Sequence, residues 1–423
     1  MHVIVIGAGV VGSTTALALA ERGLDLTLIE RHVEPAAETS HANGGGITPG
    51  HAEPWNSPGI VRRLLTRSGE GEPFRIRPGA LPGLTGWGLR FLYHSRASRY
   101  YPNARANTRL AVYSGHCLKA LRERYELNYH QYTDGSLELY FSQAELDHAL
   151  DLRRRIGDPG VEIRLLGVDD TVALEPALEP IAPRLIGAMQ LPLHESGDAC
   201  EFSAEMVRCA RSLGARVLFD TQVLTINTEN DRINGVLTDK DTISADAVVL
   251  SAGCNSPILA RPLGLRLPIY PVKGYSATLE LDQVERAPTM PLLDLEQRIV
   301  TARYGRRLRM AGLADFEGHD RSIRPERIAR LLDSAATLLP RLADEIHSGK
   351  AVPWAGLRPM TPKGPPMLGP TRIPGLYLNT GHGSMGWTQA AGSAEVLADL
   401  VTGNVPGIDM RGLGAVKDER VKV

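Results

Sequence analysis

The 423-residue sequence predicts an α/β protein in which a parallel-sheet domain is interleaved with a second, α+β domain built on a mainly antiparallel sheet. Strand and helix patterns alternate in three separate segments, at the N-terminus, after about Phe202 and after about Trp354. Between the last two segments lie further strand patterns joined by Pro-containing turns. One domain is therefore expected to be assembled from several stretches of chain, with the other threaded between them.

The N-terminal segment begins with a βαβ unit. Residues 3–6 form an apolar, β-branched run, residues 7–12 break it, and an Ala/Leu-rich helical stretch follows to about Gly23. Residues 26–29 resume as a strand that Glu30 closes. Because no linker or tail precedes this unit, the parallel-sheet domain is expected to start with the first residue.

The glycines of this unit match a dinucleotide-binding fingerprint. Gly7-x-Gly9-x-x-Gly12 lies between strand and helix, and Glu30 follows at about the 20-residue spacing that the fingerprint requires. Gly7 permits a tight turn, Gly9 lets the backbone approach a pyrophosphate, and Gly12 allows close helix packing. The Glu30 carboxylate can accept hydrogen bonds from ribose hydroxyls and disfavours a 2′-phosphate. The pattern predicts a Rossmann-like domain for FAD or NAD, the alternative being a glycine-rich turn in another α/β protein.

The later segments supply the rest of both domains. A loop over residues 41–82 is rich in Gly, Pro and polar residues, and loops of this length are usually functional or built around a ligand. The parallel-sheet domain is expected to continue as helix, strand, hairpin, strand, strand and helix at residues 203–213, 215–219, 221–237, 247–250, 376–379 and 385–400. The threaded domain is expected to hold a strand, a strand pair and a helix at residues 273–281, 299–312 and 324–339.

Composition excludes several classes of protein. With 43% hydrophobic and 22% charged residues, the chain can bury a sizeable core. Lys and Arg number 47 against 48 Asp and Glu, so no bulk charge attracts nucleic acid and no nucleic-acid partner is expected. The four scattered cysteines contain no Cys-x-x-Cys pair, which argues against a disulfide framework or a zinc site. No leader and no run of 18 apolar residues is present, so a cytoplasmic protein is expected.

A second glycine-rich helix entry lies near the C-terminus, at residues 379–388. Backbone N–H groups and a positive helix end at this place would stabilise the negative charge of a reduced flavin ring. Taken alone, this entry is better explained as a helix cap built from small residues. Together with the absence of a second dinucleotide fingerprint, it favours FAD over NAD.

Several separated motifs, in the same order, resemble the D-amino-acid dehydrogenase branch of the FAD-dependent oxidoreductases, a group that also contains D-amino-acid oxidase, glycine oxidase and sarcosine oxidase. The matching motifs are residues 7–12 with Glu30, 38–50, Pro54-Trp55, 271–276, 356–362 and 380–388. Departures lie mainly between residues 70 and 193, where substrate and acceptor preference would be set. The resemblance spans nearly the whole chain and is more specific than any one motif.

FAD is expected to bind tightly but not covalently, because the cradle glycines offer backbone contacts and no cysteine or histidine is clearly placed to bond the ring. The individual contacts are those that the resemblance implies. Residues 40–44 would contact the diphosphate, ribityl and isoalloxazine parts, Arg31 the adenosine, and Val223 the adenine. The full set of implied cofactor contacts is Gly7, Gly9, Val10, Val11, Gly12, Glu30, Arg31, Ser40, His41, Ala42, Asn43, Gly44, Val223, Ser251, Ala252, Gly253, Gly356, Arg358, Gly383, Ser384, Met385, Gly386, Trp387 and Thr388.

Four residues are candidates for substrate recognition and catalysis. The Arg358 guanidinium can grip an α-carboxylate with two charge-assisted bonds, the alternative being a structural ion pair. Tyr275 would add a hydroxyl to that carboxylate or cover the flavin, or it is a packed strand tyrosine. By resemblance, Lys273 would lie near flavin N5 through a water. His51, with Glu53, is a weaker candidate for amine recognition, and no metal is required.

The expected reaction is FAD-dependent oxidation of an amino acid, D by resemblance, to an imino acid that water hydrolyses to a 2-oxo acid and ammonia. Electrons would pass to a quinone-type acceptor. The alternatives are a dehydrogenase of D-proline or hydroxyproline, an oxygen-using oxidase, a flavin-bearing electron-relay subunit and an NAD-binding regulatory module. The sequence leaves the preferred side chain and the oligomeric state open.

Residues 87–101 and the order of the segments bear on the electron acceptor and on the division into domains. Aromatic and apolar residues alternate with arginines between residues 87 and 101, which suits either peripheral contact with the inner face of an anionic membrane near a quinone or a helix packed on its own domain. We expect an FAD-binding domain at residues 1–84, 164–262 and 351–412, a substrate domain at 85–163 and 263–350, and a tail at 413–423.

Overall fold

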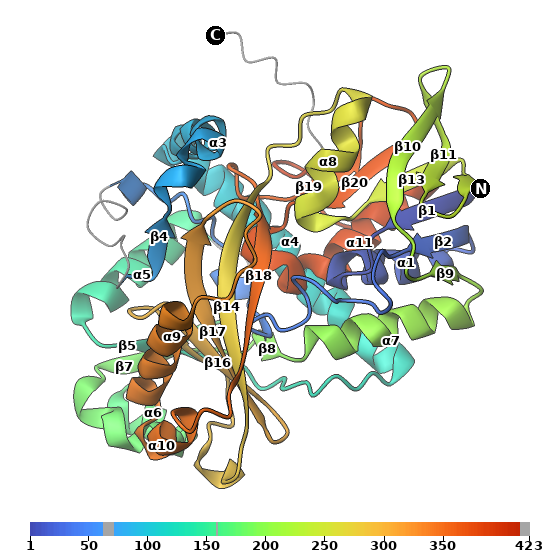
Figure 1. The fold of residues 1–423 in the computed structure, drawn as a ribbon. Helices are drawn as coiled ribbons and strands as arrows, with labels where there is room; N and C mark the ends of the chain where they lie inside the picture. Colours follow the sequence, from blue (N-terminus) through green and yellow to red (C-terminus); the bar gives the residue numbers. More distant parts are fainter. Residues whose placement is uncertain (62–71, 158–159, 415–423) are drawn as a thin grey trace.

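Two large β-sheets organise the molecule, one in each half of the ribbon (Figure 1). The computed structural model describes residues 1–61, 72–157 and 160–414, so most of the expected tail, residues 415–423, lies outside the described residues. The two sheets confirm the expected fold class, a Rossmann-like domain combined with a mainly antiparallel one.

The six-stranded sheet is the expected parallel sheet. Its order is β19-β20-β13-β1-β2-β9, and its strands are parallel except for the edge pair β19–β20. The strands, in that order, are Met367–Pro370, Leu376–Thr380, Ala247–Leu250, His2–Ile6, Asp25–Ile29 and Arg216–Leu218. Valine, isoleucine and leucine fill β1 and β13 because both faces of this sheet are covered.

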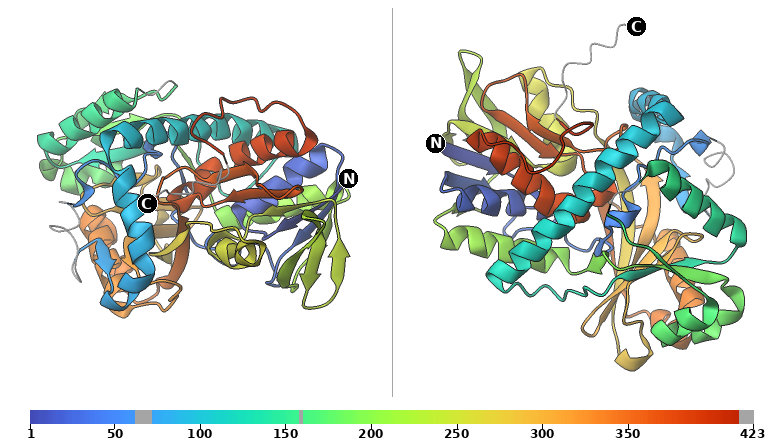
Figure 2. Two further views of the ribbon diagram at one scale, coloured as in Figure 1. Left: turned by 90° about the horizontal axis from the view of Figure 1, so that it is seen from above. Right: turned by 180° about the vertical axis from the view of Figure 1, so that it is seen from behind.

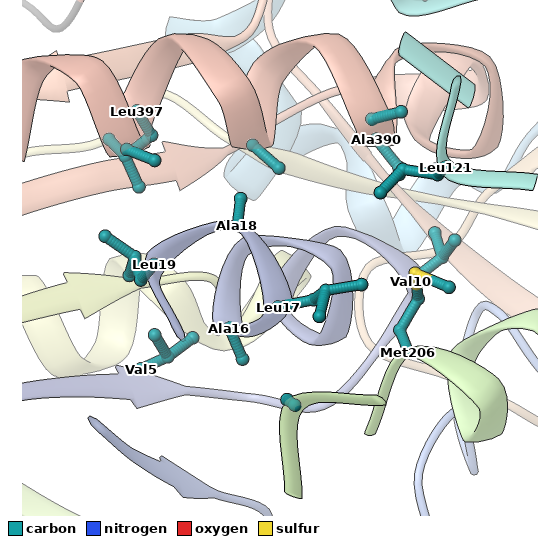
Figure 3. Packing of buried hydrophobic residues seen from close by; sticks show 14 of the residues in the cluster. Val5, Val10, Ala16, Leu17, Ala18, Leu19, Leu121, Met206, Ala390 and Leu397 are labelled. Atoms are coloured by element: carbon teal, nitrogen blue, oxygen red, sulfur yellow. The ribbon is translucent and has the colours of Figure 1, made fainter. Parts of the chain in front are cut away.

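Helices and a small sheet cover the two faces of this sheet. On one face, α1 (Val10–Glu21) packs between α7 (Ala199–Ser212) and α11 (Gly386–Thr402), with Ala18 pointing toward α11 (Figure 3). On the other face lie α8 (Ser256–Ala260) and the sheet β10-β11-β12 (Val223–Glu229, Arg232–Thr238 and Thr242–Ser244). The expected hairpin turns at Asn230 and Asp231, whose φ angles of 49° and 60° suit a primed turn.

The nine-stranded sheet is mainly antiparallel. Its order is β18-β14-β17-β16-β15-β5-β7-β6, and β4 pairs with β17. The strands, in that order with β4 last, are Val352–Met360, Tyr270–Glu280, Arg307–Phe316, Ile299–Tyr304, Leu292–Asp294, Ser136–Tyr140, Gly187–Leu191, Arg164–Leu166 and Phe74–Ile76. Helix α9 (Pro325–Leu338) packs on one face of it and is followed by α10 (Ala343–Ile346) (Figure 1). We call this the α9 face. The opposite face carries Val300 and Arg358 and borders a cavity between the two sheets, so we call it the cavity face.

The strands divide between the two sheets differently from the expected domain boundaries. Strands β4, β6, β7 and β18 belong to the nine-stranded sheet, although their residues were expected in the FAD-binding domain. Conversely, the 29-residue helix α4 (Ala97–Tyr125) crosses the back of the molecule and packs on α11 (Figure 2). The chain therefore passes between the two sheets more often than its local composition indicates. An apolar strand or helix face is buried against any available partner face, whichever sheet that partner belongs to.

The aromatic and basic stretch at residues 87–101 forms the end of α3 (Leu81–His94) and the start of α4. Trp87 and Phe91 are buried against the cavity face of the sheet, whereas Leu89 and Tyr93 are exposed. Part of the stretch is thus a helix packed on its own protein. Among the described residues, no helix combines the length and the apolar character needed to cross a membrane.

Candidate active site

A cavity of about 1040 Å³ lies where the two sheets meet. Its lining includes residues at the carboxyl ends of β1, β2, β13 and β20, which is where α/β sheets bind ligands. The nine-stranded sheet contributes side chains from its cavity face, among them Val300 and Arg358. The volume is at the upper end of the range for small-molecule sites.

The glycine fingerprint shapes one end of the cavity. A Cβ atom at Gly12 would lie 1.8 Å from the Gly7 carbonyl oxygen, so helix α1 can start here only with glycine at that position. At Gly9, by contrast, the nearest atom to a Cβ would be Ser40 Oγ at 3.4 Å. Gly9 therefore leaves open the space that a dinucleotide would need, and Gly12 serves the packing of the helix.

Glu30 is oriented by backbone donors. Its two carboxylate oxygens accept hydrogen bonds from Ala8 N at 2.7 Å and His32 N at 3.0 Å. Each oxygen retains a further lone pair for a ribose hydroxyl. Nearby, the buried Ser251 Oγ has no hydrogen-bond partner among the described residues, although it lies against the cavity. These groups fit the ribose and diphosphate of a dinucleotide.

The second glycine-rich entry closes another side of the cavity. Gly381 and Gly383 have φ angles of 79° and 60°, which disfavour other residues, and helix α11 begins directly afterwards at Gly386. The positive end of α11 therefore faces the cavity. Burial lowers the pKa of His382 to about 3, so its ring is neutral and the positive potential at this entry comes from the backbone dipoles.

Most of the expected cofactor contacts line the cavity, but three do not: Gly12, His41 and Thr388. Gly12 packs against the turn at Gly7. The exposed His41 ring lies near Cys200 and Trp354. Thr388 Oγ1 accepts from Thr48 N at 3.0 Å and so supports the wall from behind. The residues that remain are suited to hold FAD, a long cofactor with a diphosphate and a planar ring.

Arg358 is held in the cavity by the backbone. Its side chain runs from β18 across β14 at Gly274, where any Cβ would collide with the guanidinium. Nη1 donates to Leu313 O at 3.0 Å and Nη2 to Gly312 O at 3.5 Å, both on β17. These carbonyls belong to a β-bulge, because Leu313 has a φ of 59° and the β14–β17 register shifts there.

The Arg358 guanidinium has no carboxylate within 4 Å in the part of the chain that the structure describes. Its carbon lies 5.6 Å from the centre of the Trp55 ring, and the group lines the cavity. Burial lowers its pKa to about 10, opposed by the charge of Asp315. A partly buried cation without a counter-ion is costly, so this place is suited to an anionic ligand.

Lys273 and Tyr275 point away from Arg358. Successive side chains of a strand alternate between faces, and Gly274, between them, touches the Arg358 guanidinium. Lys273 Nζ pairs with Glu317 Oε2 at 2.7 Å on the α9 face and does not line the cavity. The Tyr275 hydroxyl donates to Asp315 at 3.0 Å, and the residue packs in the core beneath α9. Lys273 thus lies away from the cavity in which the flavin was expected, and Tyr275, although among the lining residues, packs as a strand tyrosine.

His51 does lie at the cavity, in a short 3-10 turn (Pro49–His51). Its Nδ1 is 3.5 Å from Glu138 Oε1 and 3.6 Å from Glu53 Oε1, without a hydrogen bond to either. Trp55 follows Glu53 by two residues, and its ring lies over the Arg358 guanidinium. The segment from His51 to Trp55 thus spans the cavity from strand β5 to the Arg358 guanidinium.

A buried ion pair supports this turn and was not expected from the sequence. Both oxygens of the fully buried Glu138 accept from Arg153 Nη2 at 2.8 Å, and Arg153 also bonds the Gly50 carbonyl. The Gly50 N–H donates to His194 Nε2 at 3.0 Å. Arg153 holds the pKa of Glu138 at about 2 against the effect of burial. The signal in the sequence was a glutamate inside the apolar strand β5, which alternation places on the cavity face.

Comparisons with known proteins extend over nearly the whole chain. The family model described as "FAD dependent oxidoreductase" matches residues 2–400. A D-amino acid dehydrogenase of Paramagnetospirillum magneticum is 42% identical over 98% of both chains, and that of Bradyrhizobium diazoefficiens is 39% identical over the same shares. The crystal structure of glycine oxidase from Bacillus cereus has a TM-score of 0.70 and 25% identity, and covers 95% of each chain.

Proposed function

Because the chain belongs to the FAD-dependent oxidoreductase family, we propose that it is a D-amino acid dehydrogenase, which converts a free D-amino acid to an imino acid and then to a 2-oxo acid and ammonia. The family assignment makes it an FAD-dependent enzyme that oxidises its substrate. The choice of a D-amino acid is supported by relatives of that name at about 40% identity over the full length. The observation that carries the proposal is the Arg358 guanidinium, which faces the cavity without a counter-ion among the described residues.

The residues at the six-stranded sheet would hold the cofactor. Glu30 would accept the ribose hydroxyls, Gly9 and the start of α1 the diphosphate, and the entry to α11 the pyrimidine side of the ring. When bound, FAD supplies the hydride acceptor for the oxidation. The protein then needs to position the substrate and to exclude water more than it needs a catalytic base.

The substrate carboxylate would pair with Arg358 beneath the Trp55 ring. The two N–H groups of a guanidinium edge match the two oxygens of a carboxylate, and the carbonyls of Gly312 and Leu313 hold the group in place. The amine would then lie toward His51 and Glu53, which continue the same segment along the cavity. A carboxylate and an imidazole suit the recognition of an ammonium group.

Electron transfer to a quinone-type acceptor is the finer part of the proposal. It is supported by the outer surface of α3 and the start of α4, where exposed Leu89 and Tyr93 lie beside arginines. Turnover with a quinone analogue should exceed turnover in air by a wide margin. Comparable peroxide formation in air would instead favour an oxygen-using oxidase.

Anaerobic reduction of the flavin tests the substrate class. D-amino acids should bleach the yellow enzyme, whereas their L-enantiomers should not. A protein that stays yellow with every D-amino acid, proline and hydroxyproline included, would refute the dehydrogenase and favour an electron-relay subunit. A purified protein without flavin colour would refute the cofactor itself.

The two glycines separate cofactor binding from folding. Gly9→Val should fold but lose FAD, because its side chain enters the space for the diphosphate while meeting only Ser40 Oγ. Gly12→Val should fail to fold, because its Cβ would overlap the Gly7 carbonyl. Circular dichroism and flavin absorbance report the two outcomes, and a yellow Gly9→Val protein would contradict the assignment of the cradle.

A further inference from the structure

Asp315 and Arg327 form a fully buried ion pair on the α9 face of the nine-stranded sheet. Neither side chain is exposed, and Arg327 Nη2 lies 2.7 Å from Asp315 Oδ1. The Tyr275 hydroxyl donates to the other carboxylate oxygen at 3.0 Å. The desolvation of two charges offsets most or all of their attraction, so a buried pair of this kind is weak support for stability. The contacts of Arg327 indicate a role other than stabilisation.

Arg327 joins helix α9 to two strands at once. Beyond Asp315 on β17, it donates to the backbone carbonyls of Glu72 at 2.8 Å and Pro73 at 3.1 Å. The Pro73 carbonyl also accepts from Ala314 N, at the point where β4 begins to pair with β17. A single planar guanidinium thus ties α9, β17 and the start of β4 in one arrangement.

The place where these strands are tied is next to the bulge that holds Arg358. Asp315 follows Leu313 by two residues, and Leu313 has the left-handed φ of 59°. A leucine keeps this conformation only where its surroundings enforce it. The bulge turns the carbonyls of Gly312 and Leu313 toward the cavity, where they accept from the Arg358 guanidinium. The conformation of the bulge therefore determines where the guanidinium lies.

We propose that Asp315 and Arg327 are positioning residues for the reaction, because their ion pair holds the β17 bulge in the conformation that aims Arg358 at the substrate carboxylate. This inference rests on the proposed function for the identity of the substrate, but it concerns any carboxylate bound at Arg358. The pair also balances charge across the sheet. Arg327 pairs with Asp315 on the α9 face, and Arg358 is left without a carboxylate within 4 Å among the described residues, so its guanidinium is open to the ligand.

The test separates carboxylate binding from turnover. Arg327→Met removes the pair and its carbonyl contacts, and benzoate serves as a carboxylate probe whose binding is followed by the flavin absorbance of the holoenzyme. We expect the benzoate dissociation constant and the KM for the best D-amino acid to rise on the order of tenfold or more, while flavin reduction at saturating substrate changes little. Arg327→Lys keeps the charge but not the fork, and should recover part of the affinity.

The control is Arg22→Met, which removes a partly buried ion-pair contact between the end of α1 and α11, where Arg22 lies 2.8 Å from both Glu395 and Asp399. It should lower the melting temperature without changing benzoate affinity. A merely structural role for Arg327 predicts that both variants lose thermal stability and keep benzoate affinity, and that result would overturn the proposal.

A second variant covers the case in which Arg327→Met does not fold. Asp315→Asn is nearly isosteric and can still accept from Tyr275, so weakened benzoate binding in this variant supports the proposal and unchanged binding refutes it. If the wild-type protein binds benzoate but oxidises no D-amino acid, the proposed function fails while the positioning role is still decided by the benzoate affinities. If the wild-type protein does not bind benzoate, the positioning role is overturned as well.

Discussion

The two faces of the nine-stranded sheet bury cations with different partners. On the α9 face, Lys273 and Arg327 each have a carboxylate oxygen at 2.7 Å. On the cavity face, Arg358 is held by two backbone carbonyls and an aromatic ring, and no carboxylate within the described residues pairs with it. A cation that has its counter-ion within the fold is structural, whereas a cation that lacks one is prepared for an anion from outside.

For the residues on the strands, alternation alone decides which face a side chain occupies. Lys273 and Tyr275 lie on β14, and Arg358 lies on the neighbouring β18, paired with Val272. A shift of one residue would exchange the faces, because the side-chain period of a strand is two. The three predictions below test the comparison between the faces, beginning with the largest expected effect.

The largest effect is expected for Arg358→Met on the cavity face. The methionine keeps an apolar stem but removes the guanidinium with its charge and N–H donors, so FAD should stay bound while the substrate carboxylate loses its charged partner. Each hydrogen bond to a charged group contributes roughly 1.5–3 kcal/mol, so two of them should raise KM by about a hundredfold or more. Steady-state kinetics on the yellow variant measures this.

Arg358→Lys should recover only part of the loss, since a point charge cannot reproduce two parallel bonds. Arg232→Met, at an exposed arginine in the β10–β11 hairpin, is the matched control and should leave kcat/KM unchanged. If the Arg358→Met enzyme binds FAD and retains a nearly normal kcat/KM, then Arg358 does not hold the carboxylate and the cavity face does not supply a cation for an external anion.

The sequence predicted the six-stranded sheet well because its signals are local. The strand, glycine turn, helix and acidic residue of the first βαβ unit are contiguous, and the strand Ala247–Leu250 is marked by an apolar run. The hairpin at Asp231, which belongs to the small sheet β10-β11-β12, is marked by its turn residues in the same local way. The reason for a glycine in this unit can also be inferred from a single sequence. Gly7 and Gly12 meet each other directly, which no other residue at position 12 would allow.

The substrate side was harder to predict because its geometry is not local. Lys273 and Tyr275 were candidates because their segment matches a family motif. Side chains alternate along β14, so both residues lie on the α9 face. The bulge at Leu313 that orients Arg358 leaves no recognisable pattern in the sequence, because a left-handed leucine is imposed by tertiary contacts. The Glu138–Arg153 pair joins residues of a strand and the helix that follows, and only packing reveals it.

The second prediction concerns the stability of the protein in acid. Groups on the two faces should lose their contributions to stability over different pH ranges. On the cavity side, burial lowers the pKa of His194 from 6.5 to about 3. The unfolded chain therefore binds a proton that the native protein does not between these values, and stability should fall as the pH drops below about 6.5, by up to roughly 1.4 kcal/mol per pH unit. On the α9 face the pKa of Glu317 is lowered by Arg324 and Lys273 against desolvation, so its contribution is lost only below its unfolded value of 4.5.

Urea unfolding of the holoenzyme at pH 7, 6 and 5 measures this difference. His194→Gln keeps an acceptor for Gly50 N and a donor for Ser136 but cannot be protonated, so the variant should lose less stability between pH 7 and 5 than the wild type. Buried His382 also lowers stability as the pH falls, so the His194→Gln variant should keep part of the dependence of its unfolding free energy on pH. Equal slopes in the variant and the wild type would mean that His194 does not titrate as its burial implies.

The smallest effect on activity is expected for Tyr275→Phe. If the hydroxyl donates to Asp315 on the α9 face, as the 3.0 Å distance indicates, its removal leaves Asp315 with Arg327 as partner and does not touch the substrate. The loss of one hydrogen bond to a buried carboxylate should lower the free energy of unfolding by about 1–3 kcal/mol, while kcat/KM stays within about threefold of the wild type. A tyrosine that bound the substrate carboxylate directly would behave in the opposite way, with stability nearly unchanged and KM raised about tenfold or more. Urea unfolding and steady-state kinetics on the same preparation distinguish the two, because the variant must lose either stability or substrate affinity according to the face on which its hydroxyl lies.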